Sequence, residues 1–86
     1  DNPDVVDTAA WIYYRRREYE KARDLLVGVS GIGEPRPIIS YHLGMIFLAL
    51  GEEARAREYL LAATAGASTY PGRQEAEKVL QGMGTG

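Results

Sequence analysis

Residues 37–63 read PIISYHLGMIFLALGEEARAREYLLAA, and apolar and small side chains recur in them at helical spacing on both sides of Gly51. A glycine between two such patterns marks a corner, because it accepts the backbone conformation that ends a helix. We therefore predict a helical hairpin with helices near residues 37–50 and 53–65. Its inward positions are Leu43, Gly44, Phe47, Ala56, Leu60 and Ala63.

A second copy of this pattern lies upstream, at a shift of about 34 residues. A fixed period between about 20 and 50 residues indicates a repeat architecture. We therefore predict a first hairpin with helices near residues 3–16 and 19–30, capped by Asn2 and followed by a turn over residues 30–35. The identical aligned pairs include Ile12 and Ile46, Glu18 and Glu52, Ala22 and Ala56, Arg23 and Arg57, and Leu26 and Leu60.

A last helix, near residues 71–82, opens at Pro71 and carries an apolar stripe formed by Ala76, Val79, Leu80 and Met83. The chain is therefore expected to be one all-α domain over residues 1–86. Its parts are a first repeat over residues 3–36, a second over 37–70 and a capping helix over 71–82. Because the chain begins at Asp1, we expect it to be a piece of a longer protein.

Composition excludes several classes of function. The 86 residues include 10 Lys and Arg, 12 Asp and Glu and no cysteine, so the net charge is −2. This balance disfavours a nucleic-acid partner, and the absence of cysteine removes disulfides and thiolate metal sites. The longest apolar run, residues 45–50, is too short to span a membrane, and the first residues do not resemble a signal peptide. The location stays open, with the cytoplasm slightly favoured.

The packing pattern resembles the tetratricopeptide repeat family, whose repeats are also about 34 residues long. In the second copy the resemblance rests on Leu43-Gly44-x2-Phe47, then Gly51, Ala56-x3-Leu60 and Ala63. The first copy carries Ala9-Ala10-x2-Tyr13, Ala22-x3-Leu26 and Val29 at the same spacing, with Arg17 at the corner position. The resemblance implies antiparallel helical hairpins stacked as a short superhelix of about five helices.

The resemblance also implies a concave face that binds peptides. On it the two repeats would place Asp7, Trp11, Tyr14, Arg15, Ile38, Tyr41, Met45 and Leu48, together with Asp4 and Ala49. Trp, Tyr and Met are enriched at the centres of protein interfaces. We therefore expect this face to bind a peptide or helix through apolar contacts. The alternative is that another repeat, or the rest of the parent protein, covers it.

The carboxylate clamp by which some members of the family grip the end of a peptide is absent. Asp7 stands at the first lysine position of the clamp, Trp11 at the following asparagine, and His42 at the asparagine of the second repeat. Asp7 would repel a carboxylate.

His42 is the one histidine and the obvious candidate for acid–base catalysis, but the sequence indicates no carboxylate or nucleophile that would be held within hydrogen-bond reach of it. Its helical neighbours are isoleucine and methionine, so it is expected to serve packing. Residues 28–33 contain a G-x-G, but they follow a helix, unlike a phosphate loop, and are interpreted as a turn. Arg15-Arg16-Arg17 is interpreted as a solvated helix end with local ion pairs, or alternatively as an anion or acidic-peptide contact.

The sequence thus predicts a non-catalytic protein-interaction module that uses no cofactor or metal. Its partner would be another protein or peptide, or another part of the parent chain, and self-association stays open. The alternative function is a packing or oligomerisation element attached to an enzyme or signalling domain outside this fragment.

Overall fold

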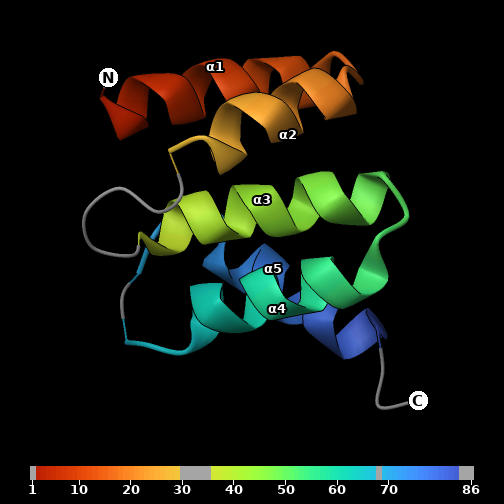
Figure 1. Ribbon diagram of the computed structural model, residues 1–86. Helices are drawn as coiled ribbons and strands as arrows, with labels where there is room; N and C mark the ends of the chain where they lie inside the picture. Colours follow the sequence, from red (N-terminus) through yellow and green to blue (C-terminus); the bar gives the residue numbers. More distant parts are fainter. Residues whose placement is uncertain (1, 30–35, 68, 84–86) are drawn as a thin grey trace.

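The computed structural model describes residues 2–29, 36–67 and 69–83. Within these residues the chain is all-α and contains no strand (Figure 1). Successive helices alternate in direction, so that α1, α3 and α5 run one way and α2 and α4 the other. The five helices are α1 (Pro3–Arg15), α2 (Tyr19–Val27), α3 (Pro37–Ala49), α4 (Glu53–Thr64) and α5 (Arg73–Met83).

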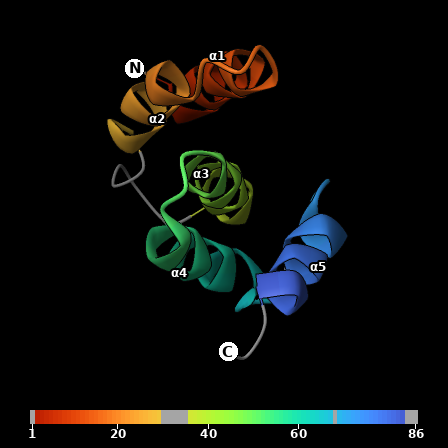
Figure 2. The same ribbon diagram turned by 90° about the vertical axis from the view of Figure 1, so that its right-hand side faces the viewer.

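Viewed down the helices, α3 lies at the centre of the molecule (Figure 2). On one side of it are α1 and α5, and on the other side are α2 and α4. Trp11 of α1 lies against Tyr41 of α3, and Tyr41 lies against the turn before α5, so these three helices share one face of the molecule. No helix in the described part of the chain is long and apolar enough to cross a membrane.

The corners of the two hairpins have the same hydrogen bonds, at positions one repeat apart. At the first corner the Glu18 N–H donates to the Tyr13 carbonyl over 2.9 Å, and at the second the Glu52 N–H donates to the Phe47 carbonyl over 2.9 Å. The residue before Glu18 is Arg17, with φ 65°, and the residue before Glu52 is Gly51, with φ 82°. Both backbone conformations are left-handed. This is the Schellman arrangement that ends a helix on a left-handed residue. Arg17, which stands where the corner glycine was expected, therefore adopts the conformation of that glycine.

We expect Arg17→Gly to stabilise the protein by about 1 kcal/mol, because an L-residue in the left-handed region is strained by roughly 1–2 kcal/mol and glycine is not. Gly51→Arg should destabilise it by a similar amount. Thermal unfolding followed by circular dichroism measures both. Equal melting temperatures for Arg17→Gly and the parent chain would show that the first corner holds no such strain.

The main core lies between the two hairpins. Its largest fully buried side chains are those of Leu26, Leu43, Ile46 and Phe47, which are at most 1% exposed. Gly44, one of the inward positions predicted from the sequence, lies at a close approach of two helices, since a Cβ there would lie 2.6 Å from Cγ of Leu60. The second hairpin is therefore held together by direct contact between the α3 backbone and a leucine of α4.

The predicted helix ends differ slightly from the observed ones. Helix α2 was expected to reach residue 30 but ends at Val27, because Gly28 follows and favours the end of a helix. Helix α5 was expected from residue 71 but begins at Arg73, after a turn through Pro71 and Gly72. The Asn2 cap is confirmed, since its Oδ1 accepts the Asp4 N–H over 2.9 Å. The predicted turn at residues 30–35 lies outside the described residues.

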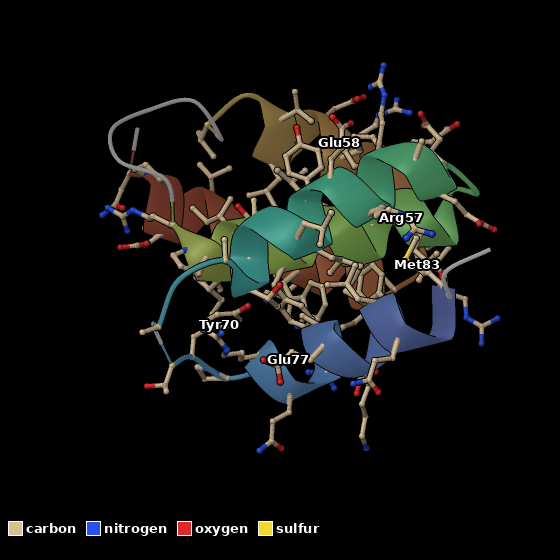
Figure 3. All side chains as sticks on the ribbon, turned by 90° about the horizontal axis from the view of Figure 1, so that it is seen from below. Arg57, Glu58, Tyr70, Glu77 and Met83 are labelled. Atoms are coloured by element: carbon tan, nitrogen blue, oxygen red, sulfur yellow. The ribbon has the colours of Figure 1, made fainter. Side chains whose placement is uncertain are left out.

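Helix α5 lies against α3 and α4 and is fastened at both ends (Figure 3). At its start, the Tyr70 hydroxyl donates to the Ala63 carbonyl over 2.7 Å, and Arg73 donates to the Thr64 carbonyl over 3.1 Å. At its end, Arg57 of α4 donates to the Met83 carbonyl over 3.3 Å. Ala76 of α5 is fully buried against Leu60 and Ala63, and Leu80 and Met83 pack beside them.

Candidate functional site

The candidate site is the face shared by α1, α3 and α5. Of the eight residues that the sequence predicts there, Trp11, Tyr14, Ile38, Met45 and Leu48 are half-buried and Arg15 is exposed. Asp7 and Tyr41 are only 7% exposed. The structure therefore offers six of the eight to a partner and places two below the surface.

Asp7 pairs with the only histidine of the chain. Its Oδ1 lies 2.6 Å from Nδ1 of His42, and both side chains are nearly buried. An ionised carboxylate only accepts, so the Nδ1–H of the imidazole donates this bond. The expectation that no carboxylate accompanies His42 is therefore wrong, because α1 brings one from a distant part of the sequence. Asp7 joins α1 to α3, and its carboxylate is not a free group for a peptide.

Trp11 stacks on two rings of its own chain. Its ring centroid lies 3.9 Å from that of His42 with the planes 20° apart, and 4.4 Å from that of Tyr14 with the planes 8° apart. Offset stacks of this kind add roughly 0.5–1.5 kcal/mol each beyond the burial of apolar area. The stack orients the Trp11 ring on the face and fixes the imidazole that Asp7 also holds.

Tyr41 is covered by the turn that leads into α5. Gly72 lies against its ring, and Tyr70 lies beside it with the ring centroids 6.2 Å apart. The sequence prediction that Tyr41 lines an open surface is therefore corrected. The capping segment folds back onto the second hairpin, which the positions of the concave residues in each repeat do not reveal.

Glu75 is a member of the face that sequence reasoning missed. It is exposed on α5. Burial is the main cause that raises the pKa of the Tyr14 and Tyr41 hydroxyls, and the charge of Glu75 raises both further, after the effect of Tyr19 in the case of Tyr14. A step of one repeat from Asp7 reaches Tyr41, and a second step reaches Glu75. That periodicity is the signal by which Glu75 could have been found. The face thus has a carboxylate on α5 and a guanidinium, Arg15, at the end of α1.

The pKa values of Tyr14, Tyr41 and Tyr70 are raised in the fold, chiefly by burial. Because folding favours the neutral phenols, their contribution to stability is complete below the ordinary tyrosine pKa, about 10. It is lost as the pH rises through the raised values. We expect the melting temperature to fall as the pH rises above about 10. Phenolate absorbance should appear at a higher pH in the folded protein than in the denatured protein. Tyr41→Phe should reduce the fall, and the same fall in that variant would contradict the assignment.

The Asp7–His42 pair is one part of the arrangements that perform acid–base chemistry. An imidazole oriented by a carboxylate is a competent base, but it needs a nucleophile within hydrogen-bond reach. Within residues 2–29, 36–67 and 69–83, Asp7 is the hydrogen-bond partner of His42, and no hydroxyl bonds to the imidazole. The same residues contain no group of three or more His, Asp or Glu that could hold a metal ion.

The basic cluster at the end of α1 makes local ion pairs. Arg16 Nε lies 3.2 Å from a Glu18 carboxylate oxygen, and Lys21 Nζ lies 3.5 Å from the other. Both cations are well exposed, so each pair contributes little to stability. This geometry favours the interpretation of a solvated helix end.

Comparison with family models, with curated proteins and with solved structures finds no match to this chain.

Proposed function

We propose that this chain is a non-catalytic, tetratricopeptide-like interaction module that binds a peptide or helix of another protein. The binding surface is the α1–α3–α5 face, defined as Trp11, Tyr14, Arg15, Met45, Leu48 and Glu75. Ile38 is half-buried and packs against the main core. Asp7 and Tyr41 are buried and contact His42 and Trp11 beneath the face.

The observation that carries the proposal is the composition of this face. Trp11 and Tyr14 of α1 and Met45 and Leu48 of α3 are large, half-buried aromatic or aliphatic side chains on two neighbouring helices. Large, orientationally fixed side chains lose little entropy when a partner covers them, which favours binding. Trp11 is fixed in this way by its stacks on His42 and Tyr14.

The kinship to tetratricopeptide repeats is supported by the two hairpin corners. Both end on a left-handed residue with matched hydrogen bonds, and each is followed by a helix whose fourth residue is a fully buried alanine, Ala22 or Ala56. These features belong to the backbone and the packed core, so they support a similarity of fold. The identity of the partner depends instead on the side chains of the face.

The chemistry of the face points to a partner with an apolar anchor. Its charges are one carboxylate and one guanidinium on different helices, whereas its central residues are aromatic and aliphatic. An amphipathic helix or an extended peptide with one large apolar residue fits this composition. A basic residue in the partner could pair with Glu75.

The proposal is tested with a peptide that is selected, from a displayed library of random peptides, for binding to the intact chain. We expect Trp11→Ala to weaken its binding roughly thirtyfold and Leu48→Ala roughly tenfold, as for central interface anchors. Leu61→Ala is the matched control, because Leu61 is 53% exposed on α4, away from this face. The affinity should change little between low and high salt.

Two outcomes would count against the face. One is a peptide that binds Trp11→Ala and Leu48→Ala as tightly as the parent chain, with circular dichroism showing both variants folded. The other is an affinity that collapses with salt and depends on Arg16, which lies outside the face, so that binding would be placed on the basic cluster. His42→Gln, if folded, should change the affinity by no more than about 1 kcal/mol, since the imidazole lies beneath Trp11.

A further inference from the structure

The outward face of α1 carries two large apolar side chains that nothing in the described part of the chain covers. Val5 is 65% exposed and Ile12 is 53% exposed. Two helical turns apart, they lie on the same side of the helix, with the half-buried Ala9 between them. Single exposed apolar residues are common on protein surfaces. Apolar residues that follow one another along two turns of one helix face form a contiguous apolar surface.

The corresponding face of α3 shows what such a surface packs against. A step of one repeat carries Val5 to Ile39, Ala9 to Leu43 and Ile12 to Ile46. These three are buried, at 5%, 0% and 0% exposed. They form one cluster with residues of the preceding hairpin, namely Ala10, Ala22, Leu26 and Val29.

We propose that the outward face of α1 docks a further helical hairpin of the same polypeptide, preceding α1 and packed on it as α1–α2 packs on α3. The occupant has a defined chemistry: two antiparallel helices that present small and branched aliphatic residues between them. The proposal rests on the equivalence of α1 and α3, and on the exposure of Val5 and Ile12.

A second copy of this chain fits the face less well. Helix α3 packs against both α1 and α2, so its apolar side chains are covered by two helices. Two copies meeting through α1 would offer each other a single helix. Where the first hairpin packs on the second, α3 makes the contact and α4 does not touch α2 in the described part of the chain. By the same arrangement, α2 would take no part when a preceding hairpin packs on α1. The docking surface is therefore α1 alone, where the exposed residues are found.

This surface is separate from the α1–α3–α5 face. Trp11 and Ile12 are neighbours in sequence and so project about 100° apart around the helix. A preceding hairpin and a bound peptide can therefore occupy α1 together. The two proposals can fail independently of one another.

The test uses the rate at which single thiols react, because the chain has no cysteine. Ile12→Cys and Leu61→Cys start from equal exposure, 53% each, and Leu61 lies on α4. Each is made in the original chain and in an extended protein in which a copy of residues 3–36 replaces residues 1–2. The added linker then leads into Pro3 as Arg36 leads into Pro37.

We expect the thiol of Ile12→Cys to react with a disulfide reagent at least about tenfold more slowly in the extended protein, because burial blocks access. The thiol of Leu61→Cys should react at the same rate in both proteins. Adding Val5→Glu to the extended protein should restore fast reaction at position 12, since a charge would be buried without a partner.

An unchanged rate at position 12, in an extended protein whose circular dichroism shows the added helices, would overturn the proposal. An extended protein that gains no helix also contradicts it, because the hairpin then finds no docking surface on α1. If Ile12→Cys already reacts slowly in the original chain, and more slowly as its concentration rises, the occupant is a second copy of the chain and the proposal is wrong.

Discussion

Deleting residues 71–86 is expected to abolish cooperative folding of this chain or to make it aggregate. The deletion uncovers Tyr41 and Leu60, which are 7% and 0% exposed, and removes Ala76 from between the helices. Uncovering one large apolar side chain costs about 1.5–3 kcal/mol, so several together approach the roughly 5–15 kcal/mol that stabilises a small domain. Circular dichroism melting and size-exclusion chromatography measure the loss.

The control is a chain that ends at Met83, which keeps α5 and its bond from Arg57. It should melt like the full chain. A chain without residues 71–86 that stays monomeric and equally stable would show that α5 is a linker and that the second hairpin needs no cap. The expected dependence follows from the packing of α5, because without this helix the second hairpin exposes an apolar face.

Asp7→Ala is expected to destabilise the protein by about 2–3 kcal/mol, although it removes only a small side chain. The substitution leaves the Nδ1–H of His42 without an acceptor, and a buried donor left unpaired costs more than a hydrogen bond contributes. For a domain of this size the melting temperature should fall by about 10–20 °C. Asp7→Ala with His42→Leu should cost less than the sum of the two single changes, because neither buried polar partner remains.

Asp4→Ala provides the matched comparison. Asp4 lies one turn before Asp7 and pairs with Arg36, also at the junction of α1 with the start of α3, but both side chains are substantially exposed. Exposed ion pairs contribute about 0–1 kcal/mol. Equal effects of Asp4→Ala and Asp7→Ala would show that burial adds nothing to the Asp7–His42 pair.

Much of the fold can be predicted from the sequence because its signals are local. Asn2 caps α1 through its own side chain, Gly51 ends α3, and apolar residues recur at helical spacing in each segment. Each of these acts over a few residues, so the number, order and approximate bounds of the helices follow without knowledge of long-range contacts. The close approach at Gly44 follows as well, since glycine inside a helix has a cost that packing must offset.

The candidate site was only partly predictable. The half-buried positions of Trp11, Tyr14, Met45 and Leu48 follow from the period of the helices, which assigns each residue to a face. Whether a residue on that face is open or covered depends on a different segment. Tyr41 is covered because the turn at Gly72 folds back onto it, and Glu75 joins the face because α5 continues the direction of α1 and α3.

The sequence by itself determined the helices, their order and the sides on which their apolar residues lie, because hydrogen bonds and side-chain period within one helix are short-range. Only the tertiary structure decided that Asp7 bonds His42, that Trp11 stacks on the same imidazole and that Arg17 takes a left-handed conformation. The first two contacts join α1 to α3, which the whole of α2 separates in the chain, and no local signal encodes the partner of a side chain at that separation. The third is imposed on Arg17 by the packing of α1 against α2, which overrides the preference of an arginine.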